Sequence, residues 1–210
     1  MNRLETIRDL IQQGAVVVDL GTDHCKLPNL LVRDGFKPVY ATEASKGPLS
    51  QAKRLAHPEV KLSLHDGLLG FREPVDTVVI AGMGGELIQK IITDSEDSFR
   101  QMSSVILQPM QQVEALRCYL LEHDFNILEE RLSREGERFY QVLSIRDGKD
   151  EPYDTRYFKT DTQDPAELIQ YYLREKSRME HLLSLYENPP YRDYLEGLES
   201  RLELLTKAYK

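Results

Sequence analysis

The sequence has no tryptophan, only two cysteines, and no apolar run close to the roughly 18 residues that a membrane span requires. Cys25 and Cys118 have no histidine or cysteine nearby at metal-ligand spacing, which excludes a zinc ribbon and argues against a disulfide-stabilised scaffold. The first residues, MNRLE, lack the apolar segment of a signal peptide. We therefore expect a cytoplasmic protein with neither a membrane anchor nor a metal site.

Basic residues are in the minority, because 27 Lys and Arg stand against 35 Asp and Glu, for a formal net charge of −8. A domain that binds phosphates is typically basic, so the total charge gives no indication of a nucleic-acid partner. Any polyanion would have to bind a local basic patch. The chain does have 210 residues, 40% of them hydrophobic and 30% charged, which suits one core-forming domain and a modest appendage.

The first 146 residues alternate short β-branched segments with helical patterns, as in an α/β fold with a parallel sheet. The predicted strands are 15–20, 38–42, 60–64, 77–81 and 104–107, and the predicted helices are 4–11, 27–33, 47–56, 86–92 and 113–121. Two more strands, 126–132 and 139–145, have so short a connection that they must form an antiparallel hairpin. These elements predict a Rossmann-like, seven-stranded class I methyltransferase sheet with a terminal β-hairpin.

Residues 147–164 are polar and turn-rich, and we interpret them as a linker that follows a domain over 1–146. Beyond this linker, apolar and aromatic residues recur at alternating spacings of three and four in two segments. Asn188-Pro189-Pro190 separates the segments. The pattern predicts an antiparallel helical hairpin over 165–210 with coiled-coil-like spacing, most simply explained by packing.

Residues capable of ligand chemistry follow the first strand, in Asp19-Leu20-Gly21-Thr22-Asp23-His24. Ligands of such sheets bind outside the carboxyl ends of the strands, and Gly21 lets the backbone approach them closely. A glycine-rich phosphate loop is missing, and Asp19 and Asp23 would repel a pyrophosphate but tolerate a cationic sulfonium. These features favour S-adenosylmethionine over NAD, although an Asp-x-Gly segment also occurs as a simple turn.

Three further strand ends supply candidate ligands of a nucleoside. Glu43 could accept both ribose hydroxyls, in either cofactor, or could be a solvated loop residue. Asp66 could accept from an adenine amino group, or Asp66-Gly67 could be a bare turn. The fourth strand ends in Ala81-Gly82-Met83-Gly84-Gly85, whose glycines indicate close approach to a ligand or a tight turn. This loop has no side chain to hold an exocyclic amine, so a ring nitrogen would suit it better as an acceptor.

Several of these segments carry a resemblance to a known family: Asp19–His24 with Leu27-Pro28, Gly47-Pro48, Asp66-Gly67-Leu68, Ile80–Gly85 and Leu107-Gln108-Pro109. With them, the chain resembles the bacterial tRNA (adenine-22-N1)-methyltransferases from Arg3 to about Ile145. The resemblance implies S-adenosylmethionine as the methyl donor and tRNA as the acceptor. The chain departs from the family pattern at Cys25-Lys26 and at Met110, near the expected pocket.

The residues expected to bind the donor are Asp19, Gly21, Thr22, Glu43, Asp66, Gly67, Ala81, Gly82 and Met83. Adenine N1 carries no proton near neutral pH, so its methylation needs no strong base, but the base must be unpaired or flipped out of its helix. Asp23 would stabilise the cationic product ring. His24 would bind the base or orient Asp23, or would be a helix-entry or core histidine without a catalytic part.

Other functions stay open at this point. The chain could methylate another RNA or a small molecule, or it could be a non-catalytic relative that uses its helical hairpin to bind a partner. An NAD enzyme is disfavoured by the missing glycine fingerprint and by the closing hairpin. The basic residues that could meet tRNA phosphates are Lys26, Arg33, Arg131, Arg134, Arg138 and Arg146.

Overall fold

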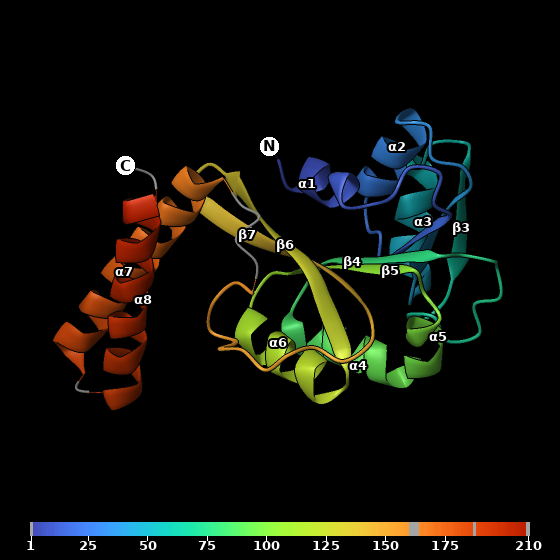
Figure 1. The fold of residues 1–210 in the computed structure, drawn as a ribbon. Helices are drawn as coiled ribbons and strands as arrows, with labels where there is room; N and C mark the ends of the chain where they lie inside the picture. Colours follow the sequence, from blue (N-terminus) through green and yellow to red (C-terminus); the bar gives the residue numbers. More distant parts are fainter. Residues whose placement is uncertain (1, 160–163, 187, 209–210) are drawn as a thin grey trace. The chain divides into compact units, whose positions relative to one another are not determined.

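The computed structural model describes residues 2–159, 164–186 and 188–208. The chain divides into two compact units, Met1–Lys159 and Thr160–Lys210. The first unit is a sheet between two layers of helices, and the second is a pair of helices (Figure 1). Part of the predicted linker (160–163) and three positions of the predicted helical hairpin (187, 209 and 210) lie outside the described residues.

Seven strands form one sheet in the spatial order β3-β2-β1-β4-β5-β7-β6. Their bounds are β1 (Val17–Leu20), β2 (Val39–Glu43), β3 (Val60–Leu64), β4 (Thr77–Met83), β5 (Ser104–Pro109), β6 (Phe125–Glu135) and β7 (Arg138–Asp147). Strands β1 to β5 are all parallel to one another, and β7 is antiparallel to both β5 and β6. The predicted class I methyltransferase sheet with a terminal hairpin is confirmed.

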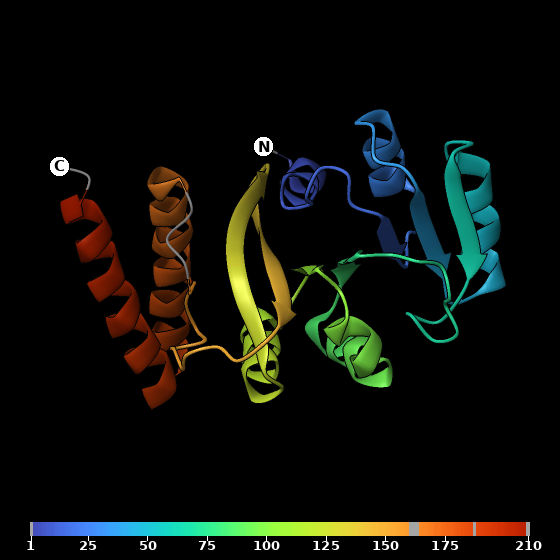
Figure 2. The same cartoon turned by 45° about the vertical axis from the view of Figure 1, so that its right-hand side comes forward.

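Helices cover both faces of this sheet (Figures 1 and 2). One layer is α1 (Arg3–Asp9), α2 (Lys26–Arg33) and α3 (Lys46–Leu55), and the other is α4 (Gly85–Asp94), α5 (Glu96–Arg100) and α6 (Val113–Glu122). The first layer packs on one apolar core that includes Ile7 and Leu31, and the second on another that includes Ile88 and Leu116. Because both faces are covered, the short parallel strands β1 and β2 are buried along their whole length.

Two local features differ from the sequence prediction. The five-residue helix α5 was not predicted, because one and a half turns are too short to give a helical repeat. The hairpin strands are longer than expected, and only Gly136 and Glu137 connect them. Gly136 has φ +60°, the left-handed conformation that a two-residue hairpin turn requires. The charged residues at the strand ends concealed this extension in the sequence.

A buried ion pair ties α6 to the hairpin. Arg117 and Glu130 are 2% and 0% exposed, and Arg117 Nε donates to Glu130 Oε1 over 2.7 Å. Arg117 also donates to Gln141 Oε1 over 2.5 Å and to the Thr155 carbonyl over 3.4 Å, while the backbone N–H of Lys159 donates to Glu130 Oε2 over 2.6 Å. Both buried charges therefore have several partners.

The second unit consists of α7 (Pro165–Leu185) and α8 (Pro189–Ala208), which confirms the predicted C-terminal helix pair. The Asp164 side chain caps α7 by accepting from the N–H of Ala166, and proline occupies the favourable start of each helix. Lys176 Nζ and Glu199 Oε1 form an ion pair between the helices over 2.7 Å. Within the described part of the chain, no helix combines the length and the apolarity needed to cross a membrane.

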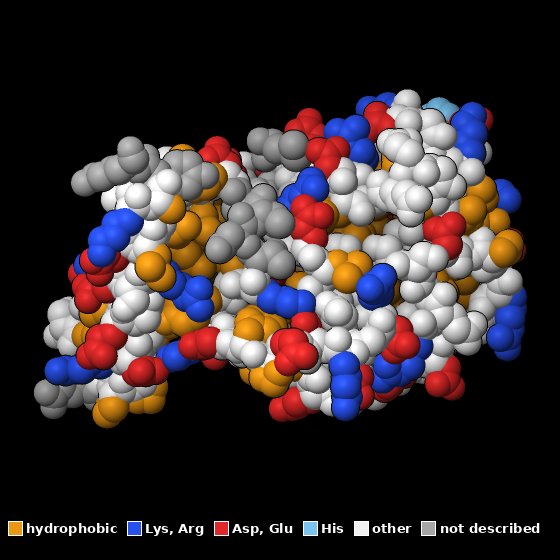
Figure 3. Space-filling model, in the orientation of Figure 1, with side chains coloured by type: hydrophobic (Ala, Val, Ile, Leu, Met, Phe, Trp, Pro, Cys, Tyr) orange, Lys and Arg blue, Asp and Glu red, His pale blue; other side chains and the backbone are white. Residues whose placement is uncertain are grey.

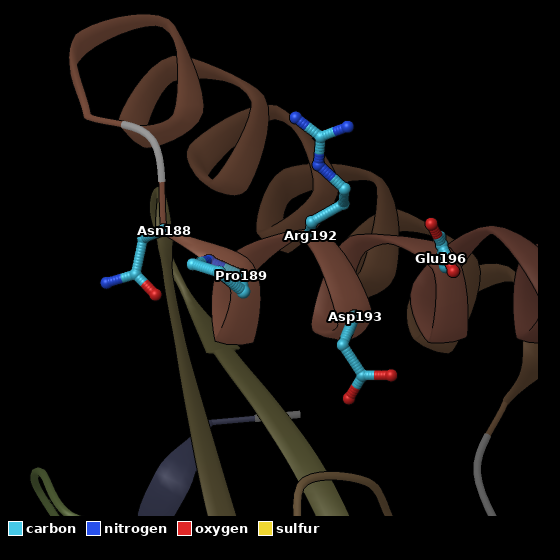
Figure 4. Close-up of a pocket in the computed structure, with 5 residues that line it drawn as sticks. All are labelled: Asn188, Pro189, Arg192, Asp193 and Glu196. Carbon is cyan, nitrogen blue, oxygen red and sulfur yellow. The ribbon is translucent and has the colours of Figure 1, made fainter.

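The start of α8 borders an open depression of about 610 Å³. Its lining residues are Asn188, Pro189, Arg192, Asp193 and Glu196 (Figure 4). Arg192 extends away from Asp193 in this view, so the polar groups do not converge on a common point. The depression therefore lacks the arrangement of a small-molecule site.

Candidate active site

A cleft of about 280 Å³ opens at the carboxyl ends of β1 and β4. Its lining residues come from α1, the ends of β1, β4 and β5, and the start of α2: Arg3, Leu4, Asp19, Gly21, Thr22, Asp23, His24, Lys26, Leu27, Ala81, Gly82, Met83 and Met110. The parallel strands bring together two segments that are about sixty residues apart in the sequence. Successive strands are placed on one side of β1 up to β3 and on its other side from β4 on, and a cleft at this switch point is the usual ligand site of such folds.

The loop after β1 folds back onto β2. The N–H groups of Gly21 and Thr22 both donate to the Thr42 carbonyl, over 2.9 and 3.2 Å. Gly21 has φ +70°, and a Cβ atom there would lie 2.2 Å from Met83 Cε. The backbone conformation therefore favours glycine, and a larger residue would displace the flexible end of Met83.

Two buried carboxylates lie behind this loop. Asp19 and Glu43 are 5% and 7% exposed, and Glu43 Oε1 accepts a hydrogen bond from the backbone N–H of Asp23. Burial raises the pKa of Asp19 to about 7, and the nearby charge of Glu43 contributes in the same direction. Among the described residues, no lysine or arginine forms an ion pair with either carboxylate. A cationic ligand would stabilise the ionised form of Asp19.

Asp23 and His24 form a pair at the mouth of the cleft. Asp23 has φ +49°, a conformation uncommon outside glycine, and its side chain is 66% exposed. His24 Nε2 lies 3.3 Å from Asp23 Oδ2, and His24 Nδ1 lies 2.9 Å from Gln51 Nε2 on α3. Because an amide nitrogen only donates, Nδ1 accepts, and the proton of the neutral ring is on Nε2, facing Asp23. His24 is thus held between α3 and the Asp23 carboxylate.

The opposite wall of the cleft depends on a buried glutamine. Gln108, at the end of β5, is 0% exposed, and its Oε1 accepts from the N–H of Gly82 over 3.1 Å. The same oxygen accepts from Arg3 Nη1 over 3.2 Å. Gly82 has φ +80°, and the N–H of Met110 donates to the Met83 carbonyl over 2.8 Å. This network fixes the glycine-containing end of β4 against the first helix.

Arg3 is a cleft residue that the sequence did not indicate as functional. Its Nε is buried without a hydrogen-bond partner in the part of the chain that the structure describes. Such an atom is costly to bury unless a ligand satisfies it. The sequence offers no signal for this role, because Arg3 reaches the cleft only through the packing of α1 over the sheet edge.

The predicted donor residues Asp66 and Gly67 do not line this cleft. Asp66 is exposed after β3, and Gly67 packs beside Ile91, whose Cγ2 would lie 3.0 Å from an added Cβ. Glu43 also lies outside the lining, but its carboxylate reaches the cleft loop through the Asp23 N–H, and its backbone carbonyl accepts from the N–H of His65 over 3.0 Å. The described residues include no group of three or more side chains suited to bind a metal ion.

The sheet order and the acidic and glycine-containing strand ends gathered at one edge define a class I methyltransferase. Residues 1–143 match the family model described as a methyltransferase domain. The chain is also 31% identical over 160 residues to the tRNA (adenine(22)-N(1))-methyltransferase of Bacillus subtilis, covering 72% of this chain and 67% of that protein. The chain belongs to the tRNA (adenine(22)-N(1))-methyltransferase family, which confirms the resemblance found in its motifs.

Solved structures with the same fold include ligand complexes. Streptococcus pneumoniae Sp1610 in complex with S-adenosyl-L-methionine matches with a TM-score of 0.83 and 29% identity over 96% of this chain and 100% of that chain. TrmK of M. capricolum in complex with S-adenosyl-homocysteine matches with a TM-score of 0.72 and 23% identity over 98% and 96% of the two chains. The second likeness concerns the fold alone.

Proposed function

We propose that the protein transfers a methyl group from S-adenosylmethionine to N1 of adenine 22 in tRNA. The observation that carries the proposal is the buried Asp19 carboxylate, which lies in the cleft without a basic partner among the described residues of a chain related to tRNA methyltransferases. Since tRNA is the substrate, the same proposal gives the protein a cytoplasmic location.

The charged groups of the cleft fit the donor. S-adenosylmethionine supplies a methyl group on a positively charged sulfur, so the methyl group needs no further activation. Asp19 suits its cationic amino-acid end, and the guanidinium of Arg3, which lines the cleft, suits its carboxylate. Glu43 uses Oε1 for the N–H of Asp23, which leaves Oε2 for the ribose hydroxyls. Asp66 and Gly67 stay candidates for the adenine, at the neighbouring strand end.

The acceptor side of the proposal assigns two roles to the mouth of the cleft. Asp23 offers an exposed carboxylate to the adenine ring, which becomes cationic when N1 is methylated. His24 acts as a positioning residue, because its Nε2–H holds the Asp23 carboxylate and Gln51 holds the ring. Adenine N1 is uncharged and has a free lone pair, so no base is needed to activate it. The rate then depends on aligning N1 with the methyl group, and such alignment can lower the barrier by up to about 7–11 kcal/mol.

The experiment that tests this function is incubation with labelled S-adenosylmethionine and unmodified tRNA, followed by nucleoside analysis. We expect label in 1-methyladenosine at position 22. A matched variant, Asp23→Asn, keeps the size of the side chain and should lower kcat while donor affinity, measured by calorimetry, stays near that of the wild type. Label in another nucleoside, or in none, would contradict the proposed acceptor.

A further inference from the structure

Two helices next to the cleft carry an unusual charge for this protein. Although the chain has a net charge of −8, α2 and α3 contain five basic residues and no acidic one. These residues are Lys26, Arg33, Lys46, Lys53 and Arg54, all of them exposed. We call this set the α2–α3 basic face.

The charges of this face are not used for ion pairs within the described residues. None of the five residues has a carboxylate within ion-pair distance, whereas neighbouring acidic residues already have other partners. Asp34, directly after α2, pairs with Arg8 over 2.7 Å, and Glu59 pairs with Lys37 over 2.8 Å. The positive charge of the face is therefore available to an external anion.

Two of the five basic residues also occupy positions that a helix disfavours for a cation. Lys26 is the first residue of α2 and Lys46 the first residue of α3, where the positive end of the helix dipole opposes a cation. Neither helix has an acidic residue in its first turn, whereas α1, α4, α5 and α6 each have at least one. Helix stability thus gives no reason for these lysines.

The face is continuous with the cleft. Lys26 lines the cleft itself, and Gln51 of α3 contacts His24 over 2.9 Å. Asn29 of α2 donates to the Leu55 carbonyl of α3 over 2.9 Å, so the two helices are fixed against each other. Lys26 and Arg33, like Lys46 and Lys53, are seven residues apart, which puts each pair on one side of its helix about 10.5 Å apart along the axis.

We propose that the α2–α3 basic face binds the phosphate backbone of the acceptor tRNA beside the adenine that enters the cleft. This inference rests on the proposed function, because it takes tRNA as the substrate. The exposed charges supply the sequence-independent part of the affinity, and the orientation they impose presents the target base to Asp23 and His24.

The arginines of the terminal hairpin form a poorer surface for the same partner. Arg131 pairs with Glu129 over 2.6 Å, and Arg134 lies 3.7 Å from Glu137. Arg138 and Arg146 are eight residues apart on one strand, so roughly 26 Å separates them. On the face that Figure 3 shows, acidic and basic side chains are intermingled over the middle of the first unit.

The test compares two triple variants that remove the same charge at different places. K46A/K53A/R54A removes three cations of α3, none of which lines the cleft. R138A/R146A/K149A removes three exposed cations that form no ion pair among the described residues of the hairpin and its flank. Binding of unmodified tRNA is measured by filter binding between 50 and 300 mM salt, donor affinity by calorimetry, and kcat and KM by label transfer.

We expect the α3 variant to bind tRNA about tenfold or more weakly near 0.1 M salt and to lose about three from the slope of log affinity against log salt. Its KM for tRNA should rise, while donor affinity stays unchanged. The charge-preserving variant K46R/K53R/R54K should restore binding. The hairpin variant should bind like the wild type.

Two results would overturn the inference. Wild-type affinity and salt slope in the α3 variant would show that the face does not bind phosphates, and an equal loss in the hairpin variant would assign binding to general charge. Failure of the proposed function is a separate result, because the wild-type protein would then bind tRNA without forming 1-methyladenosine.

Discussion

The two buried charged sites of the first unit are built in opposite ways. Between α6 and β6, Arg117 and Glu130 have opposite charges, and both have further hydrogen bonds. Behind the cleft, Asp19 and Glu43 have the same charge, and neither pairs with a basic side chain among the described residues. The first site meets the requirements for burying charge within the protein, and the second does not.

This difference indicates that the ion pair has a structural role and that the two carboxylates have a binding role. A satisfied ion pair fixes the position of elements and leaves nothing for a ligand to bind. Two buried carboxylates without a basic partner destabilise the fold by themselves, and a bound cation offsets that cost, so their presence at a strand edge indicates a binding site. We therefore expect changes at the two sites to have opposite effects on stability.

The largest effect should come from breaking the satisfied pair. Glu130→Ala leaves Arg117 buried without its counter-charge, which should lower the free energy of unfolding by about 3–5 kcal/mol in urea titrations. The double variant R117M/E130L removes both charges and should be much closer to the wild type. If the single variant unfolded like the wild type, the Arg117–Glu130 pair would not stabilise the protein, and the contrast between the two buried sites would be wrong.

The charge of Asp19 should have the opposite effect and lower the stability of the protein. Its folded pKa of about 7 lies above the ordinary value of 3.8, so the unfolded chain loses this proton at lower pH than the folded protein does. Wild-type stability should therefore fall by up to about 4 kcal/mol between pH 4 and pH 7 on account of this group.

Asp19→Asn removes that dependence. Relative to the wild type, the variant should gain stability as the pH of the urea titration rises from 4 to 8, while it loses donor affinity. In the wild-type protein, donor affinity should decrease below about pH 7, because the protonated carboxyl no longer attracts a cation. A donor affinity that stays constant from pH 6 to pH 8 would contradict the assignment of Asp19 to the cationic end of the donor.

Two substitutions of Glu43 distinguish the effect of its charge from the effect of its hydrogen bond to Asp23. Glu43→Ala removes both the acceptor of the Asp23 N–H and the proposed ribose ligand, and should weaken donor binding by roughly 1–3 kcal/mol in calorimetry. Glu43→Gln keeps an oxygen for Asp23 but removes the charge that helps to raise the pKa of Asp19. The pH at which donor affinity falls should then move downward, and an unchanged midpoint would argue against coupling of the two carboxylates.

The smallest effect concerns the backbone that covers the carboxylates. Gly21→Ala should lower stability by about 1–2 kcal/mol through its left-handed conformation, and it should weaken donor binding because Met83 must move away from the new Cβ. Gly14→Ala is the matched control, since Gly14 has φ +86° but nothing within 4 Å of an added Cβ. Equal donor affinity in the two variants would mean that Met83 does not shape the cleft.

The strand ends were predictable because the sequence marks them locally. A continuous apolar run before Asp19 and a β-branched run before Gly82 each identify a buried parallel strand, and parallel strands bring their carboxyl ends to one edge. The antiparallel pairing of the last two strands followed from their short connection. These inferences need only periodicity and chain direction.

The rest of the cleft depends on contacts that no local pattern records. Arg3 meets Gln108 across 105 positions, and His24 meets Gln51 across 27. Asp23 and Cys25 adopt left-handed conformations that their residue types do not demand, because Glu43 holds the Asp23 N–H and Ala52 accepts from Cys25 Sγ. Such features become visible only when the surrounding elements have packed.

The contacts of Arg3 also bear on how the chain acquires its cleft during synthesis. Besides Gln108, Arg3 donates its backbone N–H to Glu135 and lies with its guanidinium 5.1 Å from the ring centre of Tyr140. At ribosomal rates of about 5–20 residues per second, Glu135 follows Arg3 by on the order of ten seconds. The contacts of Arg3 with Glu135 and Tyr140 therefore form only after the terminal hairpin has been synthesised, and a nascent chain that stops before β6 has a cleft whose Arg3 lacks both.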